Sequence, residues 1–201
     1  MIVDHKGRPI IDPFNTHHAI IDLETFDTSS RAAIFALGLV IVDPELKIIF
    51  KEEYILTDPF RTPTEDSRFA NYKVSESTVA WWLSEEQVAA NHYLEDRGTY
   101  ESIRDMLNDI SHIIKQCPKD DFLVYGNPSD FDISILTNAY AKTRTPMPWK
   151  YHQSACLRTL KRLAYPGEEQ IGKFEGIKHT PLADAYHEAK ELIHVLSYLR
   201  E

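Results

Sequence analysis

Runs of hydrophobic residues in the first third of the chain predict three strands. The runs cover residues 19–24, 34–43 and 47–56 and are bounded by turn-forming residues, a pattern that is typical of buried or half-buried strands. The loop at 26–33 and the turn that begins at Asp43 are too short to contain a crossover helix. The sequence therefore predicts an antiparallel meander.

After an irregular segment at 57–74, hydrophobic residues recur at helical spacing along most of the chain. This spacing predicts helices at residues 75–90, 99–116, 130–141 and 156–165 and from 180 onward. A short apolar run at 121–127 lies between two of these helices and predicts a further strand in an α/β crossover. The expected architecture is a mixed sheet covered by helices.

The composition of the chain is that of an ordinary globular domain: of its 201 residues, 43% are hydrophobic and 26% are charged. We expect one domain at 18–201, preceded by a polar arm at 1–17. We expect neither a secretory signal nor a membrane span, because no window approaches the roughly 18 apolar residues that a span needs. The two cysteines lack metal-ligand spacing, so a reduced, cytoplasmic setting in a bacterium or a phage-infected host is expected.

The formal net charge of −9 argues against a protein that coats nucleic acid nonspecifically. It leaves room for an enzyme that holds one chain end in a local basic groove, and it suits a protein that recruits divalent cations. Basic residues gather in the last third of the chain and form either a solvated face or a phosphate groove: Lys142, Arg144, Lys150, Arg158, Lys161, Arg162, Lys173 and Lys178.

The first predicted strand, within AIIDLETF, contains two carboxylates, Asp22 and Glu24. Side chains alternate along a strand, so both point to one face, with Cα atoms roughly 6.5 Å apart. A strand that is solvated on one face would tolerate them, but the other residues at 19–23 are apolar on both faces. Two neighbouring anions on a buried strand repel each other and lose hydration, so we expect a cation to compensate them.

The last predicted helix begins with a well-formed N-terminal signal. Thr180 suits the N-cap and Pro181 the first helical position. Asp184 then lies one turn into the helix, at the border of its apolar stripe, and His179 lies just outside the cap. The histidine could also be a simple capping or core residue. His187 and His194 are expected on the opposite, solvated face, without a role in the site.

A second acidic helix start follows the predicted strand at 121–127. Asp130 and Asp132 enter the helix just after Gly126 and Asn127, and ligands tend to bind beyond strand ends in an open sheet. Together with Asp22, Glu24 and Asp184, one of these residues would complete a set of carboxylates. Hard oxygen ligands of this kind suit Mg²⁺ or Mn²⁺, and two such ions can clamp the attacking and leaving oxygens of a phosphodiester.

At this point the sequence resembles the DEDD exonucleases, in the RNase T-like branch whose general base is histidine (DEDDh). The family motif D-x-E-T matches residues 22–25, N-x-x-x-F-D matches 127–132, and H-x-x-x-x-D matches 179–184, in the family order. The second motif selects Asp132 as the ligand and leaves Asp130 as a first-turn charge that complements the helix dipole.

Two further features resemble short, single-domain phage and bacterial members of this family, such as exonuclease A of T-even phages. They are the adjacent Trp81 and Trp82, and the Leu-Arg-Thr sequence at 157–159. Adjacent residues cannot share one helix face, so we expect one tryptophan in the core and the other near the cleft, where it could stack on a base.

The resemblance implies an RNase H-like fold: a mixed five-stranded sheet, with three antiparallel and two parallel strands, flanked by helices. It implies a 3′→5′ exonuclease that takes single-stranded nucleic acid, DNA or RNA, from its 3′ end and releases nucleoside 5′-monophosphates. Asp22, Glu24, Asp132 and Asp184 would hold two Mg²⁺ ions, for which Mn²⁺ substitutes, and His179 would be the general base. A homodimer is possible, since many members of this branch are dimers.

Around this centre, the resemblance implies further residues that would receive the terminal nucleotide, with Phe26 as a stacking surface: Leu23, Thr25, Phe26, Asn127 and Trp82. Two alternatives remain open. One is an oligoribonuclease-like hydrolase of very short oligonucleotides, and the other is a non-catalytic nucleic-acid-binding module on the same fold.

Overall fold

The computed structural model of the protein describes residues 11–61, 63–64, 66–84, 88–94, 98–118, 121–167 and 171–200. Its centre is a five-stranded sheet in the order β3-β2-β1-β4-β5. The strands are β1 (His17–Thr25), β2 (Ile34–Val42), β3 (Ile48–Ile55), β4 (Phe122–Gly126) and β5 (Ser154–Cys156). β2 pairs antiparallel with β1 and β3, whereas β4 pairs parallel with β1 and β5. The predicted mixed sheet is confirmed.

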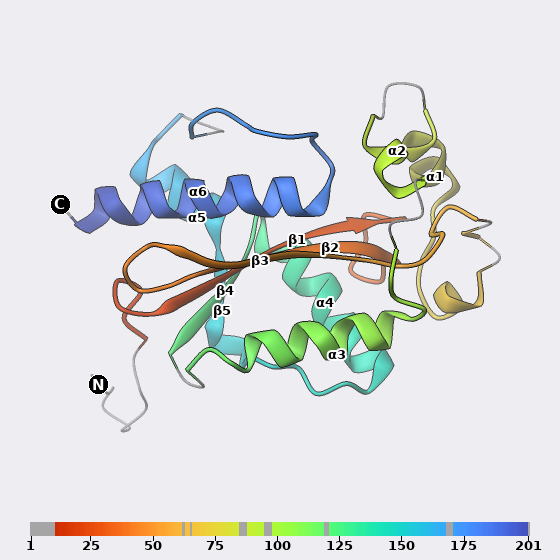
Figure 1. Ribbon diagram of the computed structural model, residues 1–201, viewed down its shortest axis with the longest axis horizontal. Helices are drawn as coiled ribbons and strands as arrows, with labels where there is room; N and C mark the ends of the chain where they lie inside the picture. Colours follow the sequence, from red (N-terminus) through yellow and green to blue (C-terminus); the bar gives the residue numbers. More distant parts are fainter. Residues whose placement is uncertain are drawn as a thin grey trace.

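Helices cover both faces of this sheet (Figure 1). On one face lie α5 (Leu157–Ala164) and α6 (Pro181–Arg200); on the other lie α3 (Ile103–Ile114) and α4 (Ser129–Thr143). Beyond one end of β1 and β2 lie α1 (Glu76–Trp82) and α2 (Val88–Leu94), and two short 3₁₀ helices cover Ser67–Phe69 and Tyr151–Gln153. In the part of the chain that the structure describes, no helix combines the length and the apolar character that crossing a bilayer requires.

The alternation along β1 explains the direction of its two carboxylates. Ile21 and Leu23 belong to the core on the α3–α4 side, whereas Ile20 packs with residues of α6 such as Leu192. Because side chains at every second position share a face, Asp22 and Glu24 point to the same side as Ile20. They therefore face the N-terminal part of α6.

A glycine lets α6 come close enough to meet them. Gly38 pairs with Asp22 across the β1–β2 ladder, and a Cβ atom built on Gly38 would lie 2.0 Å from the carbonyl oxygen of Pro181. The first turn of α6 thus rests directly on the backbone of β2. Asp184, three residues further along α6, is brought next to β1 as a result.

The structure corrects two predicted elements. The helix expected over 75–90 is two helices: α1 ends at Trp82 and is followed by the C-cap Leu83, whose N–H donates to Val79, and residues 85–87 of that prediction lie outside the described ones. The three-residue strand β5 was absent from the predicted elements, because so short an edge strand has no periodicity of its own. Residues 1–10 of the expected arm also lie outside the described part.

Two side chains that were expected at the surface, in a solvated face or, for Lys161, alternatively in a phosphate groove, are buried. Lys161 of α5 contacts Glu191 of α6 at 2.7 Å, with both side chains almost fully enclosed, and His187 packs against Phe174. Both placements have the same cause. α5 and the segment before α6 cover the side of α6 that faces away from the sheet, so α6 is buried on more than the one stripe that the sequence predicts.

The close approach at Gly38 generates a stability prediction. Gly38→Ala forces backbone atoms apart, so we expect the free energy of unfolding to fall by at least about 2 kcal/mol, as for other overpacked sites. Urea denaturation measures the loss. Gly167→Ala is the control: a Cβ there meets nothing within 4 Å and φ is +91°, so only backbone strain of about 1 kcal/mol is expected. Equal losses in the two variants would contradict the steric explanation.

Candidate active site

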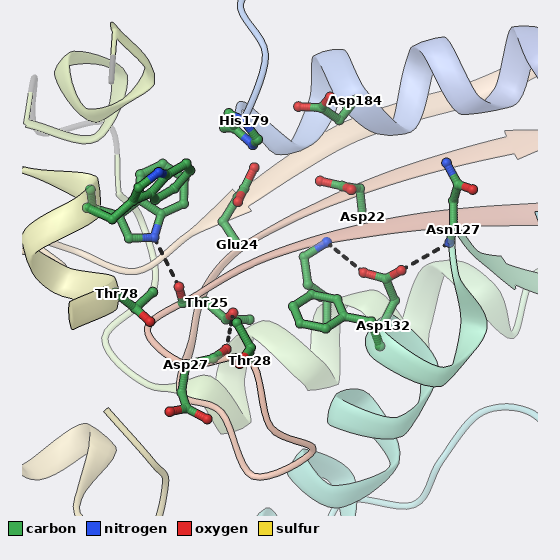
Figure 2. A pocket seen from close by; sticks show the side chains of 14 residues that line it. Asp22, Glu24, Thr25, Asp27, Thr28, Thr78, Asn127, Asp132, His179 and Asp184 are labelled. Carbon is green, nitrogen blue, oxygen red and sulfur yellow. Dashed lines mark hydrogen bonds between the residues drawn. The ribbon is translucent and has the colours of Figure 1, made fainter. Parts of the chain in front are cut away.

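A cavity of about 470 Å³ lies where β1, the start of α4, the start of α6 and α1 meet (Figure 2). All residues that the sequence assigned to the site line this cavity, except Phe26. The other lining residues are Asp27, Thr28, Thr78, Trp81 and Phe131. Segments that are far apart in the sequence therefore converge here.

Three carboxylates form the centre of the cavity. Asp22, Glu24 and Asp184 each offer an oxygen, and these atoms lie within 4.8 Å of one another. Burial, reinforced by the charge of the neighbouring carboxylates, raises the pKa of Asp22 and Glu24 well above their usual values. Burial also raises the pKa of Asp184, although the backbone N–H groups of His179 and Thr180 oppose the shift.

Asp132 is fixed by the backbone on both sides of it. The N–H of Leu23 donates to Oδ1 at 3.3 Å and the N–H of Asn127 donates to Oδ2 at 3.1 Å. Burial raises the pKa of Asp132 to about 7, and these two hydrogen bonds lower it. Gly126 makes room for the carboxylate, since a Cβ there would lie 2.8 Å from Oδ2. Asp130 is exposed, so the structure places Asp132 and not Asp130 in the site.

His179 stands at the mouth of the cavity, immediately before α6. Thr180 is the N-cap of that helix, because its carbonyl accepts from the N–H of Asp184 at 3.0 Å. The backbone of His179 is left-handed, with φ of 64°, and its carbonyl accepts a hydrogen bond from the Tyr93 hydroxyl at 2.7 Å. Its ring meets that of Trp81 edge to face, with centroids 5.2 Å apart. The imidazole is therefore held from the backbone and from the side.

One tryptophan is in the core and the other is exposed at the cavity, as the sequence predicts, but the core residue is Trp82, which the resemblance had assigned to the terminal nucleotide. Trp82 is 2% exposed and its indole N–H donates to the carbonyl of Thr25 at 3.0 Å. Trp81 is 41% exposed and lines the cavity. The prediction that Phe26 offers a stacking surface is wrong: its ring is 0% exposed and stacks on Phe35 at 4.4 Å. The residue after Thr25 turns into the aromatic core because the β1 ladder ends there.

Sequence reasoning missed a fifth carboxylate, Glu188. It is buried on α6, one turn after Asp184, and its Oε1 accepts from the side-chain amide of Asn127 at 3.0 Å. Burial, with the charge of Asp132, raises its pKa well above the usual value. The spacing of four residues from Asp184 places both on one face of the helix, and this signal could have identified Glu188.

The donor set fits a divalent cation. Each of the three central side chains offers a carboxylate oxygen as a metal ligand, the type that Mg²⁺ and Mn²⁺ prefer. Within the described ranges, Oδ2 of Asp184 and Oε2 of Glu188 are buried without a hydrogen-bond partner. Buried carboxylates with raised pKa values and unpartnered oxygens are costly to charge unless a cation lies among them.

Comparison with known proteins identifies the family. The sequence profile of the Rv2179c-like 3′-5′ exoribonuclease domain matches residues 17–196. The chain belongs to this family. The predicted resemblance to the DEDDh-type 3′-5′ exonucleases is thereby confirmed. No match to the sequence of a curated protein is found, and the likeness to phage exonuclease A stays a prediction.

Solved structures share the fold of this Rv2179c-like domain at low sequence identity. A product-bound exonuclease I has a TM-score of 0.59 at 16% identity, with 92% of this chain and 46% of that chain covered. E. coli exonuclease I in complex with a 5cy-dT13 oligonucleotide has a TM-score of 0.58 at 17% identity, with 92% and 43% covered. Cell-death related nuclease 4 (CRN-4) has a TM-score of 0.63 at 13% identity, with 92% and 64% covered. The chain thus spans less than half of exonuclease I.

The raised pKa values predict how pH affects the metal-free Rv2179c-like domain. Its folded state keeps protons on Asp22, Glu24 and Glu188 at pH values where the unfolded state has released them. Stability should therefore fall as pH rises from about 4, the unfolded pKa, toward the raised folded values. Melting curves in EDTA between about pH 5 and pH 8 measure this slope. Excess Mg²⁺ should flatten it, and a melting temperature that rises with pH in EDTA would contradict the assignment.

Removing one central charge should relieve the repulsion. We expect Asp22→Asn to raise the melting temperature of the metal-free protein, and Mg²⁺ to stabilise this variant much less than the parent. Differential scanning calorimetry with EDTA and with excess Mg²⁺ measures both effects. Asp130→Asn is the matched control, because it makes the same Asp-to-Asn change at an exposed carboxylate outside the cavity, in the first turn of α4. A metal response that Asp22→Asn leaves intact would exclude Asp22 as a ligand.

Proposed function

We propose that this protein removes nucleotides one at a time from the 3′ end of single-stranded nucleic acid, with RNA as the preferred substrate, and releases nucleoside 5′-monophosphates. The observation that carries the proposal is the meeting of Asp22, Glu24, Asp132, Asp184 and His179 in one cavity. The family description, an exoribonuclease domain, supports RNA, and exonuclease I, which shares the fold, has been solved with single-stranded DNA.

Asp22, Glu24, Asp132 and Asp184 are the residues that would hold two Mg²⁺ ions, with Mn²⁺ as a substitute. When bound, such ions lower the pKa of a water molecule and offset the charge on the departing 3′ oxygen. The backbone N–H groups of Leu23 and Asn127 keep the Asp132 carboxylate in one orientation. Asn127 in turn binds Glu188, so the acidic residues are connected before any substrate enters.

His179 is the proposed general base. Its imidazole is exposed at the mouth of the cavity that the carboxylates line, where it would take a proton from the attacking water. The Tyr93 hydroxyl and the Trp81 ring restrict where the imidazole can lie. A restricted base loses little entropy as the reaction proceeds.

The terminal nucleotide is proposed to lie between Trp81 and β1. Trp81 offers a ring face that a base can stack on, while Trp82 supports the Thr25 carbonyl from behind. Leu23 and Thr25 line the floor. Thr28 and Thr78 also line the cavity, and their hydroxyls can bind the sugar.

A 5′-labelled single-stranded RNA 20-mer tests the activity. With Mg²⁺ we expect a ladder that shortens from the 3′ end, nucleoside 5′-monophosphate as the product, and slower loss of the matched DNA strand. Hydrolysis of a dinucleotide with the 20-mer left intact would favour the oligoribonuclease-like alternative. Binding of the 20-mer without any degradation in excess Mn²⁺ would favour the non-catalytic module.

His179→Ala should lower kcat by about 10²- to 10⁴-fold, the usual contribution of a general base. The rise in melting temperature on adding Mg²⁺ should stay, because the carboxylates are intact. Single-turnover kinetics and calorimetry on the same preparation separate the two. An unchanged kcat would refute the base assignment.

Replacing each of the two tryptophans by alanine should affect a different property of the protein. Trp81→Ala should raise KM roughly 5- to 150-fold, which corresponds to about 1–3 kcal/mol of lost base stacking, with little change in the melting temperature. Trp82→Ala should cost about 3–5 kcal/mol of stability, as for other buried aromatic residues. Steady-state kinetics and urea denaturation measure the pair. The same KM for Trp81→Ala as for the parent would exclude Trp81 as the stacking surface.

A further inference from the structure

A second cavity of about 470 Å³ lies away from the carboxylates, between the segment at 67–73, the first turn of α3 and the last turn of α4. Arg68, Arg104 and Lys142 line it together with the aromatic ring of Tyr72, and Asp105 is its acidic member. Three cations around one hollow stand out in a chain whose net charge is −9. The proposed active site does not use any of these residues.

The basic side chains of this cavity differ in whether other groups of the protein already bind them. Arg68 binds Asp66 through two hydrogen bonds from Nε and one from Nη2, so its charge is balanced locally. Arg104 is exposed. Lys142 donates to the carbonyl of Asn71 and lies 4.4 Å above the Tyr72 ring. Burial, with the nearby charge of Arg31, lowers the pKa of Lys142, so Arg31 adds a further cation close by.

Tyr72 supplies the second observation that points to a ligand. Its ring is half-buried, but its hydroxyl is fully buried and has no hydrogen-bond partner among the residues that the structure describes. A buried hydroxyl without a partner is costly. Here it belongs to a ring that lines a hollow beside Arg104, whose charge acts on the pKa of Tyr72. An anionic oxygen in the cavity would satisfy both groups.

Two segments of the chain connect the second cavity with the active site. α4 carries Asp132 at one end and Lys142 at the other, ten residues later, which corresponds to about 15 Å. The loop at 27–33 runs beside it: Asp27 lines the first cavity and binds Lys73 at 3.4 Å, and the carbonyl of Ser30 accepts from the side-chain amide of Asn138 of α4 at 2.8 Å. A chain that ends in the active site can reach the second cavity in a few nucleotides.

We propose that Arg31, Arg104, Lys142 and Tyr72 form a groove for the sugar–phosphate backbone of the substrate strand, a few nucleotides upstream of its 3′ end. Basic side chains next to an aromatic ring are the combination that proteins use for single strands without regard to sequence. The inference rests on the proposed function, because it places the 3′ end among the carboxylates. It explains how an acidic protein holds a polyanion: three basic side chains lie along one path, and the carboxylates are left to the metal.

The test measures binding, so that it does not depend on turnover. In an Asp22→Asn background, the Kd of a 5′-fluorescein RNA 12-mer is measured by anisotropy over a range of salt concentrations. The Kd of an unlabelled dinucleotide, whose single phosphate occupies the active site, is measured by competition. The variant is Arg31→Ala with Arg104→Ala. The matched control is Lys47→Ala with Lys115→Ala, which removes the same charge from exposed positions, one of them at the opposite end of α3.

We expect the Arg31→Ala/Arg104→Ala variant to bind the 12-mer at least tenfold more weakly. Its salt slope should be smaller by about 1.4, since each single-strand phosphate contact contributes about 0.7. The dinucleotide should bind as before, and the control should match the Asp22→Asn parent. An equal loss for the dinucleotide, an equal loss in the control, or no loss for the 12-mer would overturn the inference.

The same variants separate this inference from the proposed function. If the chain with Asp22 restored degrades RNA but its Arg31→Ala/Arg104→Ala form binds and degrades the 12-mer like the parent, the groove is wrong and the exonuclease stands. If the parent does not degrade any strand but the arginine variant still loses 12-mer binding, the groove stands and the activity is wrong.

Discussion

Repulsion among buried carboxylates is the constraint on which the rest of this structure depends. Asp22, Glu24, Asp132, Asp184 and Glu188 act on one another's ionisation from two helices and a strand, and their charged forms are unfavourable without a cation. A fold that tolerates this repulsion must hold the carboxylates rigidly in place. Hydrophobic packing does so here: alternate residues of β1 are anchored in cores on both faces of the sheet.

Rigid placement comes mainly from the backbone. Asp132 is held by two main-chain N–H groups, His179 by a left-handed turn and a hydrogen bond to its carbonyl, and α6 by direct contact with the glycine of β2. Backbone groups have less freedom than long side chains, so little entropy is lost when the site forms. The exposed Trp81 and the mouth of the cavity are left to meet the substrate.

The sequence predicts the parts of the site that local patterns determine. Two carboxylates on an apolar strand, and an acidic residue one turn into a helix with a clear N-cap, follow from the periods of strand and helix alone. The meeting of these segments came from a family resemblance, because periodicity does not reveal which distant strands and helices are neighbours. The antiparallel meander could be predicted from the sequence, because the connections between its strands are short.

What the sequence could not supply depends on tertiary packing. Phe26 lies next to a site residue but enters the aromatic core. His187 is covered by the segment before α6, and Lys161 of α5 is buried against α6. The spacing from Asp184 could have identified Glu188, but its contact with Asn127 could not be read from the sequence. The break after Trp82 is equally non-local, since α1 ends where its indole reaches back to β1.

The enclosed pair between Lys161 and Glu191 has one more consequence. Glu191 also accepts from the main-chain N–H of Ile171 at 2.8 Å, and Ile171 begins the stretch that ends at His179. The ion pair between α5 and α6 therefore helps to fix the segment at 171–179, which ends at His179. Loss of this ion pair would therefore displace the His179 imidazole through the segment at 171–179, while every carboxylate stayed in place.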